Sequence, residues 1–208
     1  MPQRRDLCDE GLLCEGVTCV SQEGGACTAD DECTSALSCK AEGCFASFQG
    51  AGRVEVELTW DTPGGDVDLR LNRGGDRYGD CWAHLCYFAN CGNDADDFPE
   101  WDGDSGRTTG DPVMVLDDLS GFGPERIVVD TPVEGTYWVG ADFYSGSTPT
   151  AVTVNVLVDG ASVAQRTATL ENGQWWTAFS FDVVGDAISV SEGGGVVDAD
   201  DVPAWACK

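Results

Sequence analysis

Three aspartates lie close together in the stretch "LTWDTPGGDVDL", at positions 61, 66 and 68. Residues two apart on a β-strand project from the same face, so Asp66 and Asp68 are expected to lie a few ångström apart. Val67 and Leu69 then point into the core and fix this register. Neighbouring carboxylates repel unless a cation neutralises them, and Ca²⁺ binds six to eight oxygens at about 2.3 to 2.6 Å. We therefore predict a calcium site here, with Asp61 closing over the same ion.

A second acidic cluster follows about 50 residues later in "VLDDLSGFGPE", which contains Asp117, Asp118 and Glu125. These acids flank a glycine-rich turn, and backbone carbonyls in such a turn are further oxygen ligands. If the fold brings the two clusters together, they complete a cage around one ion. The alternative is that the acids are ordinary solvated turn residues.

The charge balance limits the classes of partner. The chain of 208 residues has 37 acidic and 11 basic residues, for a formal net charge of −26. Nucleic acids and anionic membrane surfaces are unfavourable partners, because both are recognised by clustered Lys and Arg. Divalent cations are favoured, and a surface adapted to a salty medium is the alternative explanation. No apolar run approaches the ~20 residues of a membrane span, so we expect no membrane insertion by the mature chain.

The eleven cysteines predict an oxidising, extracellular or cell-surface location. Seven of them lie in residues 1–46, where three cysteines recur at a shift of 25 positions, and we interpret this segment as a disulfide-rich repeat pair whose cross-links replace a core. The second copy has a fourth cysteine and so allows three pairings. We favour Cys27 with Cys39 and Cys33 with Cys44; in the first copy, Cys8 with Cys19 leaves Cys14 without a local partner.

Residues 50–190 are predicted to form an all-β domain. In "RVEVELTW" apolar and polar residues alternate, as in a half-buried antiparallel strand, and Asp159-Gly160 is a favoured pair for a type I′ turn. The punctuated strands predict a two-sheet antiparallel β-sandwich of jelly-roll or immunoglobulin-like type. Residues 191–208 form an acidic C-terminal tail. Further strands are expected in "DVDLRL", "PVMVL", "ERIVVD", "TYWVGADFY", "TAVTVNVLVDG", "ASVAQRTATL", "WWTAFSFDV" and "AISVS".

The long segment 76–111 holds Cys81, Cys86 and Cys91. A run of this length inside a compact domain is expected to be tied down. We predict one disulfide within the trio, with the third cysteine reaching Cys207. Because eleven is an odd number, at least one thiol is free or joined to another chain. The acidic runs "NDADD" and "DGDSG" suggest a second ion, although neither keeps the full calcium-loop pattern.

Three motifs carry a resemblance to a known class of domain. "LTWDTPGGDVDLRL", "GFGPERIVV" and "PVEGTYWVGADFY" resemble a β-sandwich of secreted bacterial surface proteins allied to the pre-peptidase C-terminal type, over about residues 53 to 183. The resemblance implies a non-catalytic accessory domain that binds Ca²⁺ through Asp66, Asp68, Asp118 and Glu125. Arg70 stands where a histidine is common in that class, which makes a transition-metal site less expected. The cysteine-rich segment resembles short repeats that precede other modules in secreted bacterial proteins.

Few residues suggest catalysis. His84 is the single histidine, and no serine elbow, zinc-protease motif or phosphate-binding glycine loop is present in the sequence. Trp175 and Trp176 are adjacent, so one must face the core, and the other is a possible stacking surface for a ligand. We expect a non-catalytic extracellular structural or adhesion protein, an assembly subunit of a surface layer or fibre that associates with itself or other surface proteins. The alternative is a carbohydrate-binding module for polysaccharide.

Overall fold

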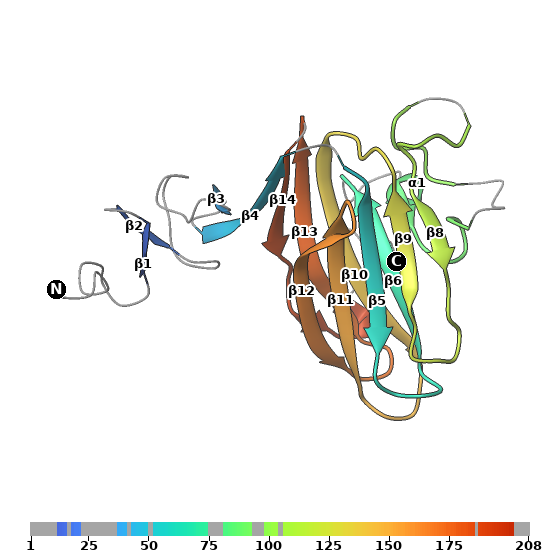
Figure 1. The fold of residues 1–208 in the computed structure, drawn as a ribbon. Helices are drawn as coiled ribbons and strands as arrows, with labels where there is room; N and C mark the ends of the chain where they lie inside the picture. Colours follow the sequence, from blue (N-terminus) through green and yellow to red (C-terminus); the bar gives the residue numbers. More distant parts are fainter. Residues whose placement is uncertain are drawn as a thin grey trace.

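The computed structural model describes residues 12–15, 18–21, 37–40, 43–49, 52–74, 81–92, 98–103, 106–185 and 187–201. Side chains before residue 52, and those of residues 81, 82 and 199, lie outside this description. Two antiparallel sheets face each other and almost all regular structure is strand, so the predicted all-β sandwich is confirmed (Figure 1).

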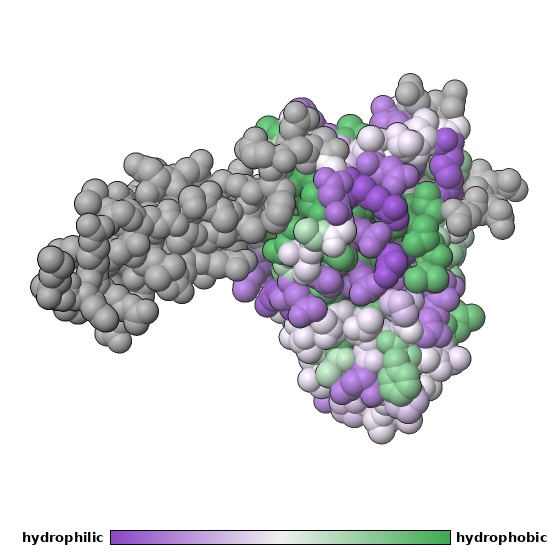
Figure 2. Space-filling model, in the orientation of Figure 1, coloured by the Kyte–Doolittle hydropathy of each residue, from purple (hydrophilic) through white to green (hydrophobic). Residues whose placement is uncertain are grey.

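The first sheet has five strands in the order β12-β11-β5-β9-β8. Its outer face is largely hydrophilic where β5 and β9 lie side by side (Figure 2), since Glu57 and Glu55 form ion pairs there with Arg126. The five strands are β5 (Val54–Trp60), β8 (Val113–Leu116), β9 (Glu125–Val129), β11 (Thr150–Val158) and β12 (Ala161–Leu170).

The second sheet has the order β3-β4-β14-β13-β10-β6-β7, and β15 also pairs with β13. Its strands are β3 (Leu37–Lys40), β4 (Gly43–Gln49), β6 (Asp66–Arg73), β7 (Leu85–Cys86), β10 (Gly135–Ser145), β13 (Trp175–Val184), β14 (Ala187–Glu192) and β15 (Val196–Val197). A short 3-10 helix, η3 (Ala199–Asp201), follows β15.

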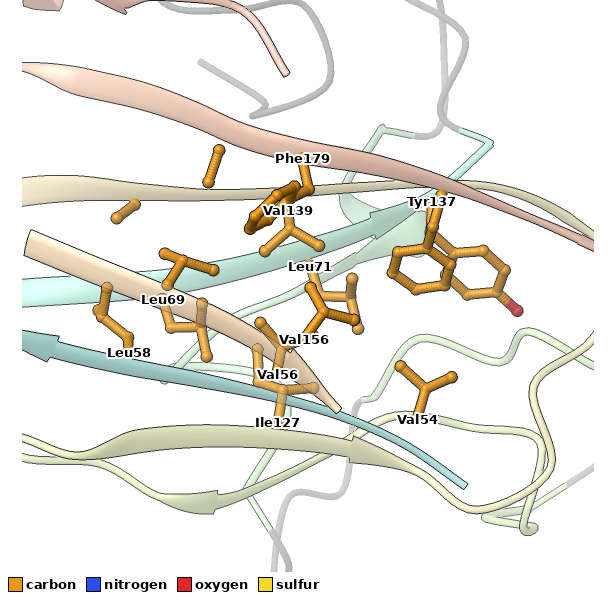
Figure 3. Close-up of a cluster of buried hydrophobic side chains, with 14 of the residues drawn as sticks. Val54, Val56, Leu58, Leu69, Leu71, Ile127, Tyr137, Val139, Val156 and Phe179 are labelled. Atoms are coloured by element: carbon orange, nitrogen blue, oxygen red, sulfur yellow. The ribbon is translucent and has the colours of Figure 1, made fainter. Parts of the chain in front are cut away.

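Alternating apolar residues from both sheets fill the space between them. On β5, Val54, Val56 and Leu58 are fully buried while the intervening residues are half-buried, which is the expected period of two. Figure 3 shows these side chains pointing at those of the opposite sheet, where the ring of Tyr137 stacks on that of Phe181 at 4.6 Å. Two-sided burial of this kind supplies most of the free energy that holds a sandwich together.

The predicted hairpin turn between β11 and β12 is confirmed. Asp159 and Gly160 have φ values of 49° and 79°, and a type I′ turn requires positive φ at both positions. Asp159 also accepts a hydrogen bond at Oδ1 from the backbone N–H of Arg53 at 3.0 Å. This contact ties the turn to the residue that precedes β5.

The cysteine-rich segment contains two hairpins at the spacing of the sequence repeat. β1 (Leu12–Glu15) and β2 (Thr18–Ser21) begin 25 positions before β3 and β4. Cys14 faces Cys19 in the first hairpin, as Cys39 faces Cys44 in the second. β4 then pairs with β14, so one strand crosses the boundary predicted at residue 46. The disulfide pairings predicted for this segment lie outside the described residues.

In the described part of the segment between β6 and β8, the disulfide Cys86–Cys91 closes a short loop, which confirms the predicted bond within the trio. It follows a short helix, α1 (Cys81–His84). The side chain of Cys81 and all of Cys207 lie outside the described residues, as does the whole of "NDADD". In "DGDSG", Asp102 accepts a hydrogen bond from Thr108, so the described part of this loop uses its carboxylate internally. Among the described residues, no helix is long and apolar enough to cross a membrane.

Candidate metal centre

Three carboxylates from the two sheets meet at one open side of the sandwich. Asp66, Asp68 and Glu125 each present an oxygen, and these three oxygens lie within 4.8 Å of one another. Asp66 and Asp68 lie on β6, whereas Glu125 is the first residue of β9 in the opposite sheet. Both acidic clusters predicted from the sequence therefore contribute to one group.

The side chain of Glu125 reaches β6 because of the alternation of β9. Glu125, Ile127 and Val129 share the inward face, and all three are fully buried. β7 pairs with Leu71 and Asn72 only, so within the described residues no strand pairs with the beginning of β6 on that side. There the backbone N–H of Leu69 donates a hydrogen bond to Glu125 Oε2 at 2.5 Å. This bond satisfies an edge amide and aims the other oxygen of Glu125 at the aspartates.

The two aspartates lie on the outer face of β6, as predicted. Val67 and Leu69 are fully buried on the core face, which fixes the register, and Asp66 and Asp68 project from the other face. Asp68 is only 3% exposed, while Asp66 is partly exposed. The group is therefore buried at Asp68 and Glu125 and open towards Asp66.

One oxygen of each carboxylate is buried without a hydrogen-bond partner. These atoms are Asp66 Oδ1, Asp68 Oδ2 and Glu125 Oε1. Buried polar atoms nearly always have partners, and an unpaired buried charge is costly. A cation bonded at about 2.4 Å can touch oxygens up to about 4.8 Å apart, and the oxygens of this group lie within that separation. The geometry therefore fits one hard cation of calcium size.

Burial raises the pKa of each of these acids. Burial raises the pKa of Glu125 to about 9, although the hydrogen bond from Leu69 opposes the shift. Burial and then the charge of Asp142 raise the pKa of Asp68 to about 7, with Arg70 opposing. The pKa of Asp66 is raised by burial and then by Asp117. Without a cation the group must therefore take up protons near neutral pH.

Asp117 and Asp118 lie beside the group in different roles. Asp117 is exposed and lies close enough to raise the pKa of Glu125, so it is a fourth candidate ligand. Asp118 instead accepts hydrogen bonds from the backbone N–H groups of Ser120 at 3.2 Å and Gly123 at 3.0 Å. Both of its oxygens hold the 118–123 turn, so in this arrangement it shapes the loop and does not point a free oxygen at the ion.

Asp61, which we expected to close over the ion, lies elsewhere. Its Oδ1 accepts hydrogen bonds from the hydroxyls of Thr62 and Thr150, both at 3.1 Å, and from the backbone N–H of Ala151 at 2.8 Å. These contacts fasten the β5–β6 loop to the beginning of β11. The first cluster therefore divides into a metal-ligand pair and a loop-fastening residue.

Arg70 lies next to the group and has its own partners. Its Nε donates to Asp142 Oδ1 on the neighbouring strand β10, and its Nη2 is 3.7 Å from Asp68 Oδ2. The guanidinium carbon lies 4.6 Å from the ring centre of Trp175 and 5.1 Å from that of Tyr87. Arg70 is only 7% exposed, so this cation–π arrangement holds it in place and neutralises Asp142.

The tryptophan pair divides between core and surface as predicted. Trp176 is 2% exposed and packs in the core, whereas Trp175 is half-buried on the opposite face of β13. Since one face of the Trp175 ring lies against Arg70, that face does not serve as a stacking surface. The prediction that one of these residues stacks on a ligand remains a prediction.

Asp142 is the residue of this region that the sequence did not reveal. It lies opposite Asp68 in the register of β10 and β6, within "GADFY", which has no acidic cluster of its own.

Comparisons with protein families, with curated proteins and with solved structures found no match to this chain. The resemblance to the pre-peptidase C-terminal type of domain therefore stays a prediction.

Proposed function

We propose that this chain is a non-catalytic extracellular or cell-surface protein for adhesion or assembly, and that Ca²⁺ stabilises its sandwich. Asp66, Asp68 and Glu125 are the proposed ligands, with Asp117 as a fourth. One observation carries this proposal: Asp66, Asp68 and Glu125 each bring one oxygen within 4.8 Å of the others, and each has a buried oxygen without a hydrogen-bond partner. A bound ion joins β6 to β9 at a point where no backbone pairing joins the two sheets.

The choice of Ca²⁺ over other ions rests on ligand chemistry. All of the proposed ligands are carboxylate oxygens, which hard cations prefer and for which soft transition metals compete poorly. Mg²⁺ requires a near-octahedral arrangement at about 2.0 to 2.1 Å, whereas Ca²⁺ accepts irregular geometry. Ligands from two different sheets cannot easily close to the shorter distance, so we favour Ca²⁺.

The same acids are poorly arranged for catalysis. A carboxylate pair that cleaves a glycosidic bond needs one protonated and one ionised member in separate environments. Here Asp68 and Glu125 lie in one buried cluster and burial raises the pKa of both, so separate environments do not divide them into an acid and a base. A binding or structural role follows more directly from this site than proton transfer.

The edges of the sheets support an assembly role. β12 is an edge strand of ten residues with the sequence "ASVAQRTATL", which contains no acid in a chain of net charge −26. Free edges of this kind can accept a strand from a partner, and lack of acid reduces repulsion between copies. Because the chain has eleven cysteines, at least one thiol is left over from disulfides within the chain and is available to link two chains.

Thermal unfolding in millimolar CaCl₂ and in EDTA tests the calcium part of the proposal. With Ca²⁺ at about 100 times its Kd, the expected stabilisation is about 2.7 kcal/mol, or roughly 5 to 10 °C in Tm for a domain of this size. Equal Tm values in the two buffers would refute it. Light scattering with and without Ca²⁺ tests assembly, for which defined oligomers are expected and a strict monomer is the contrary result.

A further inference from the structure

The bound ion would have coordination positions left over. Three carboxylate oxygens, with Asp117 as a fourth ligand, fill part of the six to eight positions that Ca²⁺ uses. Asp117 is exposed, and Asp66 is partly exposed although its unpaired Oδ1 is buried, so the solvent side of the group is the side of these two residues. Asp68 and Glu125 close the opposite side because they are buried. An oxygen from outside the chain can therefore reach the ion.

The net charge of the Ca²⁺-loaded site determines which kind of external oxygen is a favourable ligand. Asp66, Asp68, Asp117 and Glu125 carry four negative charges when ionised, and one Ca²⁺ neutralises only two of them. Arg70 lies 3.7 Å from Asp68 Oδ2, and its charge is shared with Asp142. Because the loaded site keeps a net negative charge, an acidic side chain or an anionic lipid is an unfavourable ligand. Neutral oxygens are favoured, and two adjacent hydroxyl groups of a sugar supply them as a chelating pair.

An exposed aromatic ring lies in the loop that carries the ligands. Phe122 is 54% exposed and precedes Glu125 by three residues. Its carbonyl accepts a hydrogen bond from the N–H of Trp60 at 3.0 Å, and the next amide, that of Gly123, donates to Asp118. The backbone on both sides of the ring is thus held in place at the end of the sandwich where the β5–β6 and β8–β9 loops lie together (Figure 1).

We propose that the loaded site binds carbohydrate, with two neighbouring hydroxyls of one sugar on the ion and the ring of Phe122 against the apolar face of that sugar. This inference rests on the proposed calcium site and names the ligand class for the adhesion role. An aromatic ring suits the task because it buries much apolar area with little loss of conformational freedom. Phe122 takes the stacking role for which the sequence suggested the tryptophan pair.

The test is retention of the full chain on beads that carry mannan, galactan or cellulose, in millimolar CaCl₂ and in EGTA. We expect retention on at least one of these matrices in Ca²⁺, release by EGTA, and release by the corresponding free monosaccharide. Phe122→Ala is expected to weaken retention about tenfold while the Ca²⁺-dependent rise in Tm is unchanged. Val184→Ala is the matched control. Val184 is 64% exposed and ends β13, whereas Trp175, at the beginning of that strand, lies against Arg70 beside the acidic group.

The outcomes separate the two proposals. A Ca²⁺-dependent rise in Tm without retention on any of the three matrices overturns the carbohydrate inference and leaves the calcium site intact. Retention that is equal in EGTA, or equal in Phe122→Ala, also overturns it. Retention on phosphatidylserine vesicles and not on polysaccharide assigns this face to membranes and overturns it as well. Absence of any Ca²⁺ effect on Tm is the failure of the proposed function itself.

Discussion

Replacing Glu125 with glutamine should change the stability of the protein in opposite directions with and without Ca²⁺. Glutamine keeps an oxygen to accept the hydrogen bond from Leu69 and carries no charge, so it imitates the protonated acid. In EDTA at pH 8, Glu125→Gln removes a buried group that must otherwise take up a proton or carry an unpaired charge. In Ca²⁺ it removes a ligand.

The magnitude follows from the pKa of Glu125, which rises from an ordinary value of 4.5 to about 9. One pKa unit corresponds to about 1.4 kcal/mol, so folding of the ionised form at pH 8 carries a penalty of at most about 5 kcal/mol. Asp68 competes with Glu125 for protons in the same group, and we therefore expect the variant to gain only about 2 kcal/mol, or roughly 4 to 8 °C. At pH 5 the gain should be close to zero, because Glu125 is then protonated in the folded wild type.

Calorimetry of wild type and Glu125→Gln at pH 8, each in EDTA and in CaCl₂, measures both effects. The variant should melt higher than wild type in EDTA and should lose most of its response to Ca²⁺. Glu171→Gln is the matched control, because Glu171 is an exposed turn residue outside the acidic group, and it should change neither quantity. A variant that melts lower than wild type in EDTA and keeps the full Ca²⁺ response would refute the reasoning.

Two further predictions concern pH and the loop fastened by Asp61. Since burial raises the folded-state pKa of Asp68 to about 7 and of Glu125 to about 9, the ion-free protein binds more protons folded than unfolded, and its Tm should fall as pH rises from about 5 to 9. Ca²⁺ should flatten this fall, which unfolding curves in both buffers will show; a Tm that rises over this range without Ca²⁺ contradicts the prediction. Asp61→Ala should lower Tm equally in CaCl₂ and EDTA, because Asp61 holds Thr150 and Ala151 and no ion. A selective loss of the Ca²⁺ response in Asp61→Ala would place it among the ligands after all.

The strands and the acidic pair on β6 were predictable because their signal is local. Alternation between neighbouring residues fixes which side chains face the core, so Val67 and Leu69 place Asp66 and Asp68 on one face. The turn at Asp159 was predictable for a similar reason, since few residues tolerate its positive φ. The contribution of Glu125 was expected from a second acidic cluster beside a glycine-rich turn.

The remaining parts of the site depend on contacts between distant segments. Asp61 bonds to Ala151, 90 positions away, and nothing within "WDTPGG" shows that this partner will be present. Asp142 meets Arg70 only because β10 pairs with β6 in one particular register. The position of Trp175 over Arg70 follows from the pairing of β13 with β10. Cross-strand register is set by the packing of the whole sandwich, so a local pattern does not encode it.

A crystal structure of the protein grown with CaCl₂, with anomalous scattering measured at a long wavelength, tests the central claim most directly. The account predicts one anomalous peak bonded at about 2.3 to 2.6 Å to oxygens of Asp66, Asp68 and Glu125. Carboxylates that hydrogen-bond to one another as protonated pairs, with no peak between them at millimolar Ca²⁺, would contradict it.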